Sequence, residues 1–361
     1  MSVGTSCLIL SPSSGFGGGI ERVSDAVISA WPGPVARVDL YRVGRNRRPG
    51  GGRVAKVRLG LAAAAAVVRR RPDHILCMHA GMLPAAVVLG ALAHRPVTLF
   101  GYGTEVWAPM PRWERVCVGR CRRVVAISGF TAEWLARRAE LSPSRVTLLR
   151  LPIAPSLAQA ATAINPLPPS GRDLQVITVA RLDPEHRYKG QFRIAEAWPT
   201  ILTQHPGARW LVVGGGDDVD ALARRCRELG IEHAVEIRSS VSDGELAAAY
   251  AQSRVHALPS TANVHTTPPT GEGFGLAYAE AGAFAVPSVA AFESGGAADI
   301  VEHDVTGLCS PDDPKALADA ILRLLEDEEL CDRLGAASRM RVLEHHLPEQ
   351  FVAAVRQMYD T

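Results

Sequence analysis

The sequence is poor in aromatic residues and contains no long uncharged apolar run. Phe, Trp and Tyr make up 6% of the 361 residues. They are not interleaved with the arginines, as a surface for stacking bases would require, so we expect no nucleic-acid partner. The longest apolar stretch of interest, residues 82–93, falls short of the roughly 20 residues that cross a bilayer. A membrane-spanning helix is therefore not expected.

The chain also lacks the pattern of a signal peptide. Its first positive charge is Arg22, and the apolar run at residues 7–10 is too short for the hydrophobic part of a secretion signal. The seven cysteines are scattered; Cys117 and Cys121 have the i, i+4 spacing of a helix, but no second pair completes a zinc pattern. We expect no metal site and a cytoplasmic protein with reduced thiols, soluble or at most peripheral to the inner face of the plasma membrane.

The overall composition is that of a globular protein with two domains. Hydrophobic residues make up 47% of the chain and charged residues 21%, and the length allows each domain to bury a core. The net charge of +2 is small, but residues 37–71 are strongly basic, with eleven cations from Arg37 to Arg71 against one acid, Asp39. This stretch is either a solvated loop and helix face, or a patch that faces an anionic membrane or a phosphorylated acceptor.

Strand and helix patterns alternate through the first half. We expect strands at residues 3–10, 74–79, 96–100, 124–128 and 146–149. Helices are expected at residues 20–28 and 82–93, and one capped by Ser128 or Thr131 should run through Arg138. A glycine loop precedes the first helix. This order predicts a doubly wound parallel sheet.

A proline-rich segment at residues 151–171 separates this half from a second alternating half, and we interpret it as a linker because proline sustains neither helix nor central strand. We expect strands at residues 174–179, 210–213, 234–237, 255–258 and 288–291, and helices at residues 191–203, 219–229 and 244–252, from Pro314 and from Leu330. Pro199 should kink the first of these helices or mark its true start. A last helix, at residues 348–359, is expected to pack back over the first half.

The predicted organisation is α/β throughout, with two Rossmann-like doubly wound domains facing a central cleft. The domains are residues 1–160 and 172–345, followed by the C-terminal helical segment 346–361. Ligands of such sheets bind outside the carboxyl ends of the strands, so the cleft is the expected site.

The stretch from Gly271 to Glu280 carries the strongest chemical signal. Glu272 and Glu280 stand eight residues apart, and a glycine turn followed by an apolar helical run lies between them. Free N–H groups and the dipole at a helix start favour an anion, and two carboxylates add acceptors for hydroxyl groups. The combination predicts a ligand with both phosphate and sugar.

Four stretches of the second half resemble the family 4 retaining glycosyltransferases of the GT-B fold. Arg181 with Lys189-Gly190 resembles the clamp on the donor phosphates, Gly214–Gly216 the glycine turn, and Glu272 with Glu280 the Glu-x7-Glu signature. Gly295-Gly296 and Thr306-Gly307 fit the stretch downstream. In the first half, residues 17–22 resemble the N-terminal glycine loop and residues 103–105 the end of the His-Gly-x-Glu motif, in which Tyr102 replaces the usual histidine.

The resemblance implies transfer of a hexosyl or N-acetylhexosaminyl group from a nucleotide-diphosphate sugar to an acceptor hydroxyl, with retained configuration. It implies no metal and no cofactor beyond this co-substrate, and an N-terminal domain that binds the acceptor. The implied catalytic residues are Arg181, Lys189 and Glu272. The implied donor-binding residues are Gly18, Gly19, Gly214, Gly216, Gly273, Phe274, Gly275, Leu276 and Glu280. The implied acceptor or sugar contacts are Tyr102, Glu105 and His79.

Three alternatives remain at this point. Glu272 and Glu280 resemble the acid–base pair of a glycosidase, although eight helical residues would separate them by about 12 Å, more than such pairs tolerate. A nicotinamide oxidoreductase would suit two Rossmann-like halves, but Gly214-Gly-Gly-Asp217 lacks the Gly-x-Gly-x-x-Gly spacing. A non-catalytic or degenerate nucleotide-sugar-binding protein is favoured by Tyr102 alone.

Overall fold

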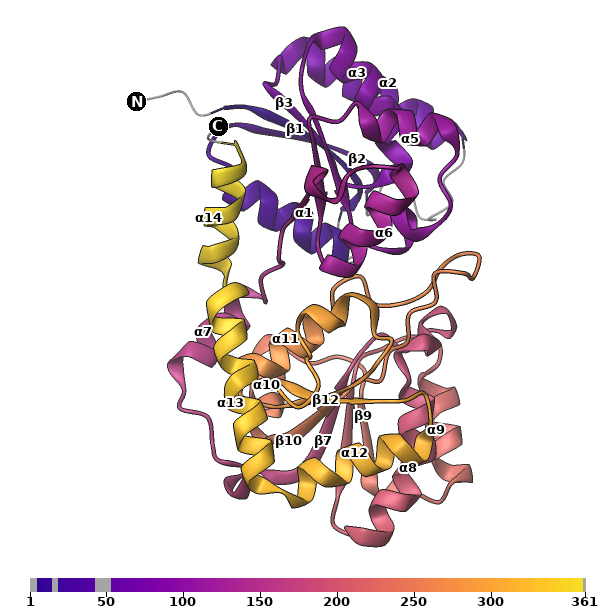
Figure 1. The fold of residues 1–361 in the computed structure, drawn as a ribbon, viewed down its shortest axis with the longest axis vertical. Coiled ribbons are helices and arrows are strands. Elements are labelled where there is room, and N and C mark those ends of the chain that lie inside the picture. The colour runs from indigo at the N-terminus through magenta and orange to yellow at the C-terminus, as the bar shows by residue number, and fades with distance from the viewer. Residues whose placement is uncertain (1–4, 15–18, 43–52, 360–361) are drawn as a thin grey trace. The chain divides into compact units, whose positions relative to one another are not determined.

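The structure, a computed structural model, describes residues 5–14, 19–42 and 53–359, and the chain divides into two compact units. Unit 1 comprises Met1–Leu151, Thr267–Pro269 and Glu349–Thr361, and unit 2 comprises Pro152–Thr266 and Thr270–Pro348. Each unit contains one six-stranded sheet whose neighbouring strands are all parallel, with helices packed on it (Figure 1). The prediction of two doubly wound α/β halves is confirmed.

The sheet of unit 1 has the strand order β2-β1-β3-β4-β5-β6. Its strands are β1 (Cys7–Ser14), β2 (Val35–Arg42), β3 (His74–Cys77), β4 (Val97–Gly101), β5 (Arg123–Ala126) and β6 (Val146–Leu148). Every residue of β4 is buried, as expected of a central strand with helices on both faces. The apolar runs that predicted these strands are thus the core of the unit.

Helices follow the strands of unit 1 in the predicted alternation. They are α1 (Gly19–Ala30), α2 (Arg53–Arg70), α3 (Leu83–Ala93), α4 (Thr104–Trp107), α5 (Arg112–Gly119) and α6 (Gly129–Ala139), with short 3-10 turns at Ala80–Met82 and Pro143–Arg145. Of the two predicted caps for α6, Ser128 is the cap, because its Oγ accepts from the N–H of Thr131 at 3.1 Å. None of the helices in the described ranges is both long and apolar enough to cross a membrane.

The last helix, α14 (Pro348–Tyr359), lies from Glu349 onward in unit 1. The ring of Tyr359 packs against Trp31, with 4.4 Å between centroids, and against His74 at 5.5 Å. The guanidinium of Arg123 lies 5.8 Å from the Tyr359 ring. Aromatic packing of this kind joins the end of the chain to the core formed by its beginning.

The basic stretch at residues 37–71 is not one exposed surface. Arg37 lies in β2, and its guanidinium pairs with Asp39 on the same strand face and with Asp25 of α1. These contacts occupy the Arg37 side chain, so Arg37 is not available to a membrane or to a phosphorylated acceptor. Residues 43–52 lie outside the described part of the chain.

The sheet of unit 2 has the strand order β12-β11-β10-β7-β8-β9. Its strands are β7 (Asp173–Val179), β8 (Arg209–Val213), β9 (Val235–Arg238), β10 (Ser253–Ala257), β11 (Ser288–Ala291) and β12 (Gly307–Ser310). All five residues of β10 are buried. The core on one face of the sheet is centred on the stacked rings of Trp198 and Trp210, whose centroids are 5.7 Å apart.

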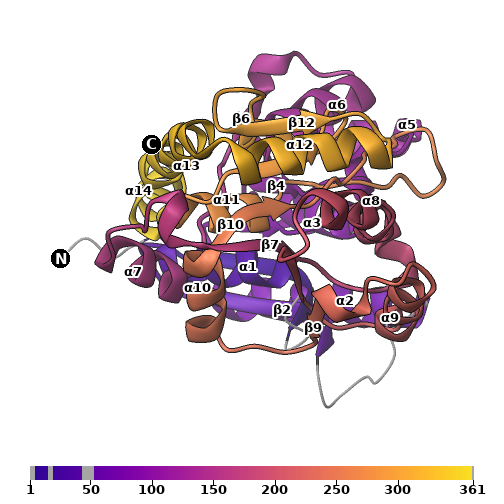
Figure 2. The same ribbon diagram turned by 90° about the horizontal axis from the view of Figure 1, so that it is seen from below.

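The helices of unit 2 cover its sheet in two groups. They are α7 (Pro155–Ala163), α8 (Gln191–Gln204), α9 (Val219–Glu228), α10 (Asp243–Gln252), α11 (Leu276–Ala283), α12 (Pro314–Glu326) and α13 (Glu328–His345), with 3-10 turns at Pro169–Gly171, Pro184–Lys189, Glu232–Ala234 and Gly295–Asp299. Helix α8 contacts α9 and α12, whereas α7 contacts α10 and α11, and α11 contacts α13 (Figure 2). The helix α11 that follows the glutamate motif is thus held between the sheet and two other helices.

One prediction about proline in unit 2 was wrong, and one of the two alternatives for Pro199 is excluded while a kink remains a prediction. The proposed linker contains helix α7, with Pro155 in its first turn, where the missing N–H costs nothing because no partner exists there. Leu157, Ala158 and Ala161 are buried on its inner side. Pro199 lies inside α8, which already begins at Gln191, so it does not mark the start of that helix.

Candidate functional site

The structure brings two of the predicted catalytic residues of unit 2 into direct contact. The ammonium of Lys189, at the end of a 3-10 turn, forms an ion pair with Oε1 of Glu272, 83 residues later in the chain. Both side chains are largely buried, 14% and 12% exposed. A pair this far from water holds each partner strongly. Lys189 and Glu272 therefore form a largely buried ion pair, in which each side chain fixes the position of the other.

Contacts to its side chain and backbone fix Glu272 in place. Ser260 donates from Oγ to Glu272 Oε1 at 3.1 Å. The carbonyl of Glu272 accepts from the N–H of Gly296 at 2.7 Å. Gly295, with φ of +66°, passes so close that a Cβ there would lie 2.8 Å from the same carbonyl oxygen. Gly295 and Gly296 thus fix the position of the Glu272 backbone.

The turn after Glu272 starts helix α11 in a left-handed conformation. Gly275 is its N-cap residue with φ of +91°, and a Cβ there would lie 2.7 Å from the ring of Tyr278. Leu276 is the first residue of the helix, so the N–H groups at the start of the helix lie only a few residues after Glu272 in the sequence. The ring of Phe274 is 3% exposed and packs edge-on against His346 at 5.4 Å. The side chain of Phe274 therefore packs in the core, and any donor contact of this residue would be made by its backbone.

The second carboxylate, Glu280, lies on the same helix and is 5% exposed. Tyr250 of α10, fully buried, donates from its hydroxyl to Glu280 Oε2 at 3.3 Å. Burial first, and then the charge of Glu280, raise the pKa of Tyr250 well above its usual range, so the hydroxyl keeps its proton and remains a donor. Tyr250 thereby fixes the orientation of the Glu280 carboxylate.

The glycine turn Gly214–Gly216 packs against the segment that carries Arg181. A Cβ on Gly214 would lie 1.8 Å from the carbonyl oxygen of Ala180, and one on Gly216 would lie 2.2 Å from that of Leu182. The N–H of Gly214 already donates to the carbonyl of Arg238 at 2.9 Å. Only glycine allows the backbone of Gly214–Gly216 to lie this close to the backbone of Ala180–Leu182. Arg181, within the second of these segments, follows β7 and has an exposed side chain.

A histidine between the two predicted phosphate-binding cations was missed from the sequence. Burial, then the positive charge of Lys189 and more weakly that of Arg181, lower the pKa of His186. Asp183 and Glu185 oppose this shift, and together with His186 they form a group whose ligand atoms could hold a metal ion. Asp183 also accepts a hydrogen bond from the N–H of Asp217 at 3.2 Å. We therefore interpret Asp183, Glu185 and His186 as residues that stabilise the turn after β8, and not as metal ligands.

The predicted contacts of unit 1 serve local structure. Nδ1 of His79 accepts from the N–H of Gly81 at 2.9 Å and caps a 3-10 turn, and Glu105 accepts from the N–H of Tyr102 at 2.6 Å. The ring of Tyr102 is buried, and burial raises its pKa. Gly18 lies outside the described residues. Helix α1 begins at Gly19.

The supporting residues Ser260, Tyr250 and His186 had no sequence signal that marked them. Ser260 follows β10, and Tyr250 lies on α10. Their contacts with the two glutamates depend on how β10 and α10 pack beside α11, which a motif spacing does not contain.

A buried histidine beside this site makes the stability of the protein depend on pH. His256 of β10 lies 5.2 Å from the ring of Tyr278, and burial lowers its pKa to about 3. The unfolded chain, with an ordinary histidine pKa, binds the extra proton below about pH 6.5. Stability contributed by neutral His256 is therefore present above that pH and lost as the pH falls towards 3.

We expect the free energy of unfolding of the wild type to fall by about 2 kcal/mol more than that of His256→Asn between pH 7 and pH 5. The asparagine can still contact Ser288, which lies 2.9 Å from Nδ1 of His256. Urea unfolding at the two pH values measures the difference, and equal losses in both proteins would show that His256 is not the group responsible.

Comparisons with known proteins identify the family of the chain. The profile of a family described as "Glycosyl transferases group 1" matches residues 161–341, half of the chain, and that of "Glycosyltransferase Family 4" matches residues 23–157. A GDP-mannose-dependent alpha-(1-6)-phosphatidylinositol monomannoside mannosyltransferase of Mycobacterium tuberculosis is 33% identical over 165 residues, which are 45% of this chain and 41% of that protein. Human alpha-1,3/1,6-mannosyltransferase ALG2 is 28% identical over 200 residues, 52% of this chain and 45% of that protein. The matches thus span less than half the length of these curated relatives.

Solved structures share the fold over the whole chain. Anabaena HepE in complex with UDP and glucose has a TM-score of 0.73 at 18% identity, with 98% of this chain and 99% of that chain covered. Sucrose-phosphate synthase from Thermosynechococcus elongatus has a TM-score of 0.72 at 19% identity, with 99% and 98% covered. With the two profile matches, the two parallel sheets and the Lys189–Glu272–Glu280 arrangement, the chain belongs to the family of glycosyl transferases group 1.

Proposed function

We propose that the protein is a retaining glycosyltransferase that moves a sugar from a nucleotide-diphosphate sugar to an acceptor hydroxyl. The observation that carries the proposal is the buried Lys189–Glu272 pair next to the start of α11, with Glu280 on the same helix. A cation, the N–H groups at the start of a helix and two carboxylates held by hydrogen bonds provide partners for a diphosphate and for hydroxyl groups.

In this proposal the positive charge stabilises the leaving group. Negative charge grows on the diphosphate as the glycosidic bond breaks, and fixed donors aimed at developing charge are usually the largest catalytic term. Arg181 offers a planar fork and Lys189 a compact ammonium. Glu272 accepts from hydroxyls of the donor sugar and Glu280 from the ribose. The seating of both glutamates by Ser260 and Tyr250 supports these roles because it fixes the acceptor oxygens before the ligand arrives.

Retention is proposed to come from attack on the same face of the sugar from which the nucleotide leaves. The departing phosphate accepts the proton of the acceptor hydroxyl, so the step needs neither a protein nucleophile nor a metal. The new glycosidic bond forms to the acceptor oxygen, and the nucleoside diphosphate leaves with the electron pair of the broken bond.

The names of the relatives support a proposal about the sugar donor. The mycobacterial relative is named for GDP-mannose and HepE was solved with UDP, and an N-acetyl-alpha-D-glucosaminyl L-malate synthase of Bacillus anthracis is 28% identical over 167 residues. We therefore propose a hexosyl or N-acetylhexosaminyl donor carried by UDP or GDP, and an acceptor bound by unit 1. A cytoplasmic site of action with peripheral membrane contact remains part of the proposal.

A thermal-shift panel of UDP, GDP, ADP and TDP, followed by donor-consumption assays with sugars of the nucleotide that binds, tests the proposal. One nucleoside diphosphate should raise the melting temperature, and its sugar should be consumed. Binding without any transfer or donor hydrolysis would favour a non-catalytic nucleotide-sugar-binding protein. A shift with NAD or NADP alone would overturn the proposal.

Glu280→Gln is expected to weaken nucleotide binding by about 10- to 100-fold, because a neutral amide replaces the charged acceptor of the ribose hydroxyls. Tyr250→Phe, which removes one hydrogen bond that orients the carboxylate, should weaken it by about 2- to 10-fold. Calorimetric titration with the diphosphate and with its 2′,3′-dideoxy analogue measures both effects. The two variants should lose affinity for the diphosphate and hardly any for the analogue, and equal losses for both ligands would contradict ribose recognition by Glu280.

A further inference from the structure

Most of the exposed apolar side chains among the described residues lie on three helices of unit 1. Twelve large apolar side chains are exposed among all the described residues. Seven of the twelve lie on α2, α3 and α5: Val57, Leu61, Val68, Val88, Leu92, Trp113 and Val116. Helix α2 contacts α3, and α3 contacts α5, so the helices form one continuous surface, here called the α2–α3–α5 face (Figure 1). Such a concentration of apolar groups in water indicates a binding surface.

The outward side of α2 has the pattern of a helix that faces something other than water. Val57, Leu61 and Val68 are 61%, 68% and 75% exposed, and their spacing of four and then seven residues places them on one side of the helix. A helix that faces water normally carries charged or polar residues there. Between Val57 and Val68 the sequence has a single charged or polar residue, Arg58.

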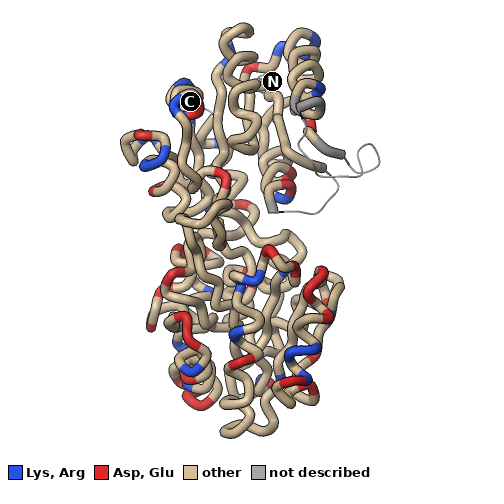
Figure 3. Tube along the Cα trace, turned by 90° about the vertical axis from the view of Figure 1, so that its right-hand side faces the viewer, with Lys and Arg blue, Asp and Glu red and all other residues tan. Residues whose placement is uncertain are grey.

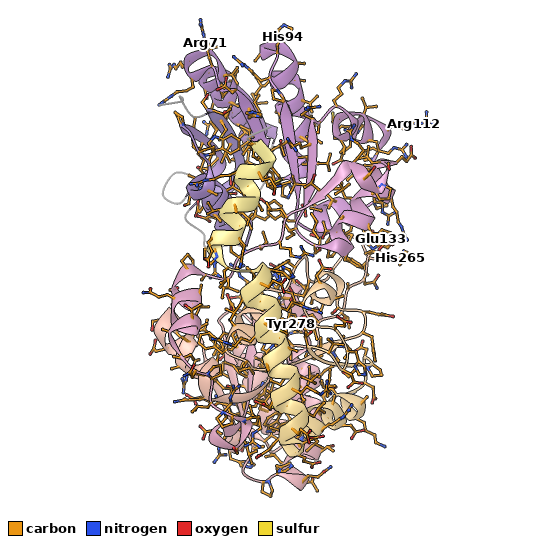
Figure 4. All side chains as sticks on the ribbon, turned by 60° about the vertical axis from the view of Figure 1, so that its left-hand side comes forward. Arg71, His94, Arg112, Glu133, His265 and Tyr278 are labelled. Atoms are coloured by element: carbon orange, nitrogen blue, oxygen red, sulfur yellow. The ribbon has the colours of Figure 1, made fainter. Side chains whose placement is uncertain are left out.

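Positive charge predominates on and around the same face, although Glu114 lies on α5. From Val57 to Arg122 the sequence has nine arginines against three acids, and two of these arginines are paired, Arg95 with Asp73 and Arg115 with Glu140. The other seven are exposed and form no ion pair within the described ranges: Arg58, Arg69, Arg70, Arg71, Arg112, Arg120 and Arg122. Figure 3 colours Lys and Arg blue and Asp and Glu red; helix α3 itself contains none of these residues, and the seven arginines belong to α2, to α5 and to the segments that follow these two helices. In Figure 4, Arg71, His94 and Arg112 point away from the sheet of their unit.

We propose that the α2–α3–α5 face docks on an anionic phospholipid bilayer. Arginines on the face pair with headgroup phosphates, while Trp113 and Leu92, 57% and 77% exposed, enter the interface between headgroups and acyl chains. Tryptophan favours this depth because its ring is apolar and its N–H is polar. The inference rests on surface composition and does not depend on glycosyl transfer. It also differs from the membrane patch predicted at residues 37–71, since Arg37 is excluded and α3 and α5 are added.

Other partners fit the face less well. A second copy of the same face would bring seven unpaired arginines against seven, which repels. A nucleic acid would use the arginines but leave the valines and leucines without apolar partners, and Trp113 is the one exposed aromatic ring on the face for bases to stack on. A bilayer with anionic headgroups offers acyl chains to the apolar side chains of the face and phosphates to its arginines.

Flotation of the full chain with vesicles tests the proposal. We expect binding to phosphatidylcholine vesicles that contain about one third phosphatidylglycerol, weak binding to pure phosphatidylcholine, and loss of most binding at about 0.5 M NaCl. The double variant Leu92→Ser/Trp113→Ser should bind anionic vesicles at least about tenfold more weakly, as should Arg70→Gln/Arg71→Gln.

Matched controls separate the face from general surface properties. Phe292→Ser/Met340→Ser removes apolar groups of comparable exposure, 58% and 68%, from unit 2, and Arg224→Gln/Arg227→Gln removes two exposed arginines there. Both controls should bind like the wild type. Equal binding to neutral and anionic vesicles, no binding to either, or equal losses in face and control variants would each overturn the proposal. So would a concentration-dependent dimer in sedimentation that Trp113→Ser abolishes while vesicle binding is unchanged.

Discussion

Replacement of Lys189 by alanine is expected to lower the turnover of glycosyl transfer by about 100- to 1,000-fold. The ammonium is the cation that the fold holds beside the start of α11, through its pair with Glu272 and its place 5.6 Å from the ring of Tyr188. Without it, the leaving diphosphate loses a fixed positive partner when its charge develops. Steady-state kinetics with the identified donor measure the effect.

The same substitution also destabilises the protein, because Glu272 is left largely buried without its cation, at a cost of up to about 3 kcal/mol. Lys189→Arg separates the two effects. It keeps a positive charge for Glu272, so most of the stability should return, but a planar fork replaces a compact ammonium, and turnover should stay at least about tenfold low. Arg187→Ala is the control, because that neighbouring cation is exposed and pairs with Asp218 at 2.6 Å. A turnover of Lys189→Ala within about threefold of the wild type would remove Lys189 from the mechanism.

Replacement of Gly214 by alanine is expected to destabilise the protein by about 3–5 kcal/mol. Gly214 has φ of +141°, which alanine rarely adopts, and the new Cβ would lie 1.8 Å from the carbonyl oxygen of Ala180. The segment that carries Arg181 must move to relieve the overlap. The melting temperature should fall by about 10 °C, and nucleotide binding by whatever folded protein remains should weaken.

Gly244→Ala is the matched control for this substitution. Gly244 lies on α10, where an added Cβ meets nothing within 4 Å, so alanine should leave stability unchanged or raise it slightly. Urea unfolding of both variants tests the comparison. If Gly214→Ala unfolds within about 1 kcal/mol of the wild type, the close approach of the two backbone segments is not essential.

The regular part of the fold could be predicted because its apolar periodicity is strong. Strand β4, buried along its whole length, is apolar except for Thr98 and lies between turn residues. Strand β2 was missed because Arg37 and Asp39 stand on one of its faces, where their mutual ion pair replaces apolar burial. Helix α7 was missed because proline was taken to exclude a helix, although at the first turn it does not.

The site could be predicted only where its residues are close in sequence or belong to a known motif. The spacing of Glu272 and Glu280 gave the two carboxylates and the start of α11. The spacing could not predict the hydrogen bonds from Tyr250 and Ser260 to these glutamates, because those contacts depend on tertiary packing. The inward packing of the Phe274 ring against His346 likewise depends on tertiary structure, and a donor contact of Phe274 remains a prediction.

The most direct test of a donor site built on Arg181 and Lys189 is donor consumption by the wild type and by Arg181→Ala/Lys189→Ala. The nucleotide that stabilises the wild type in the thermal-shift panel defines the sugar donors to use. The wild type should release the nucleoside diphosphate, and the folded double variant should release it at least about 1,000-fold more slowly. Wild-type-like transfer by the double variant would contradict the proposed mechanism.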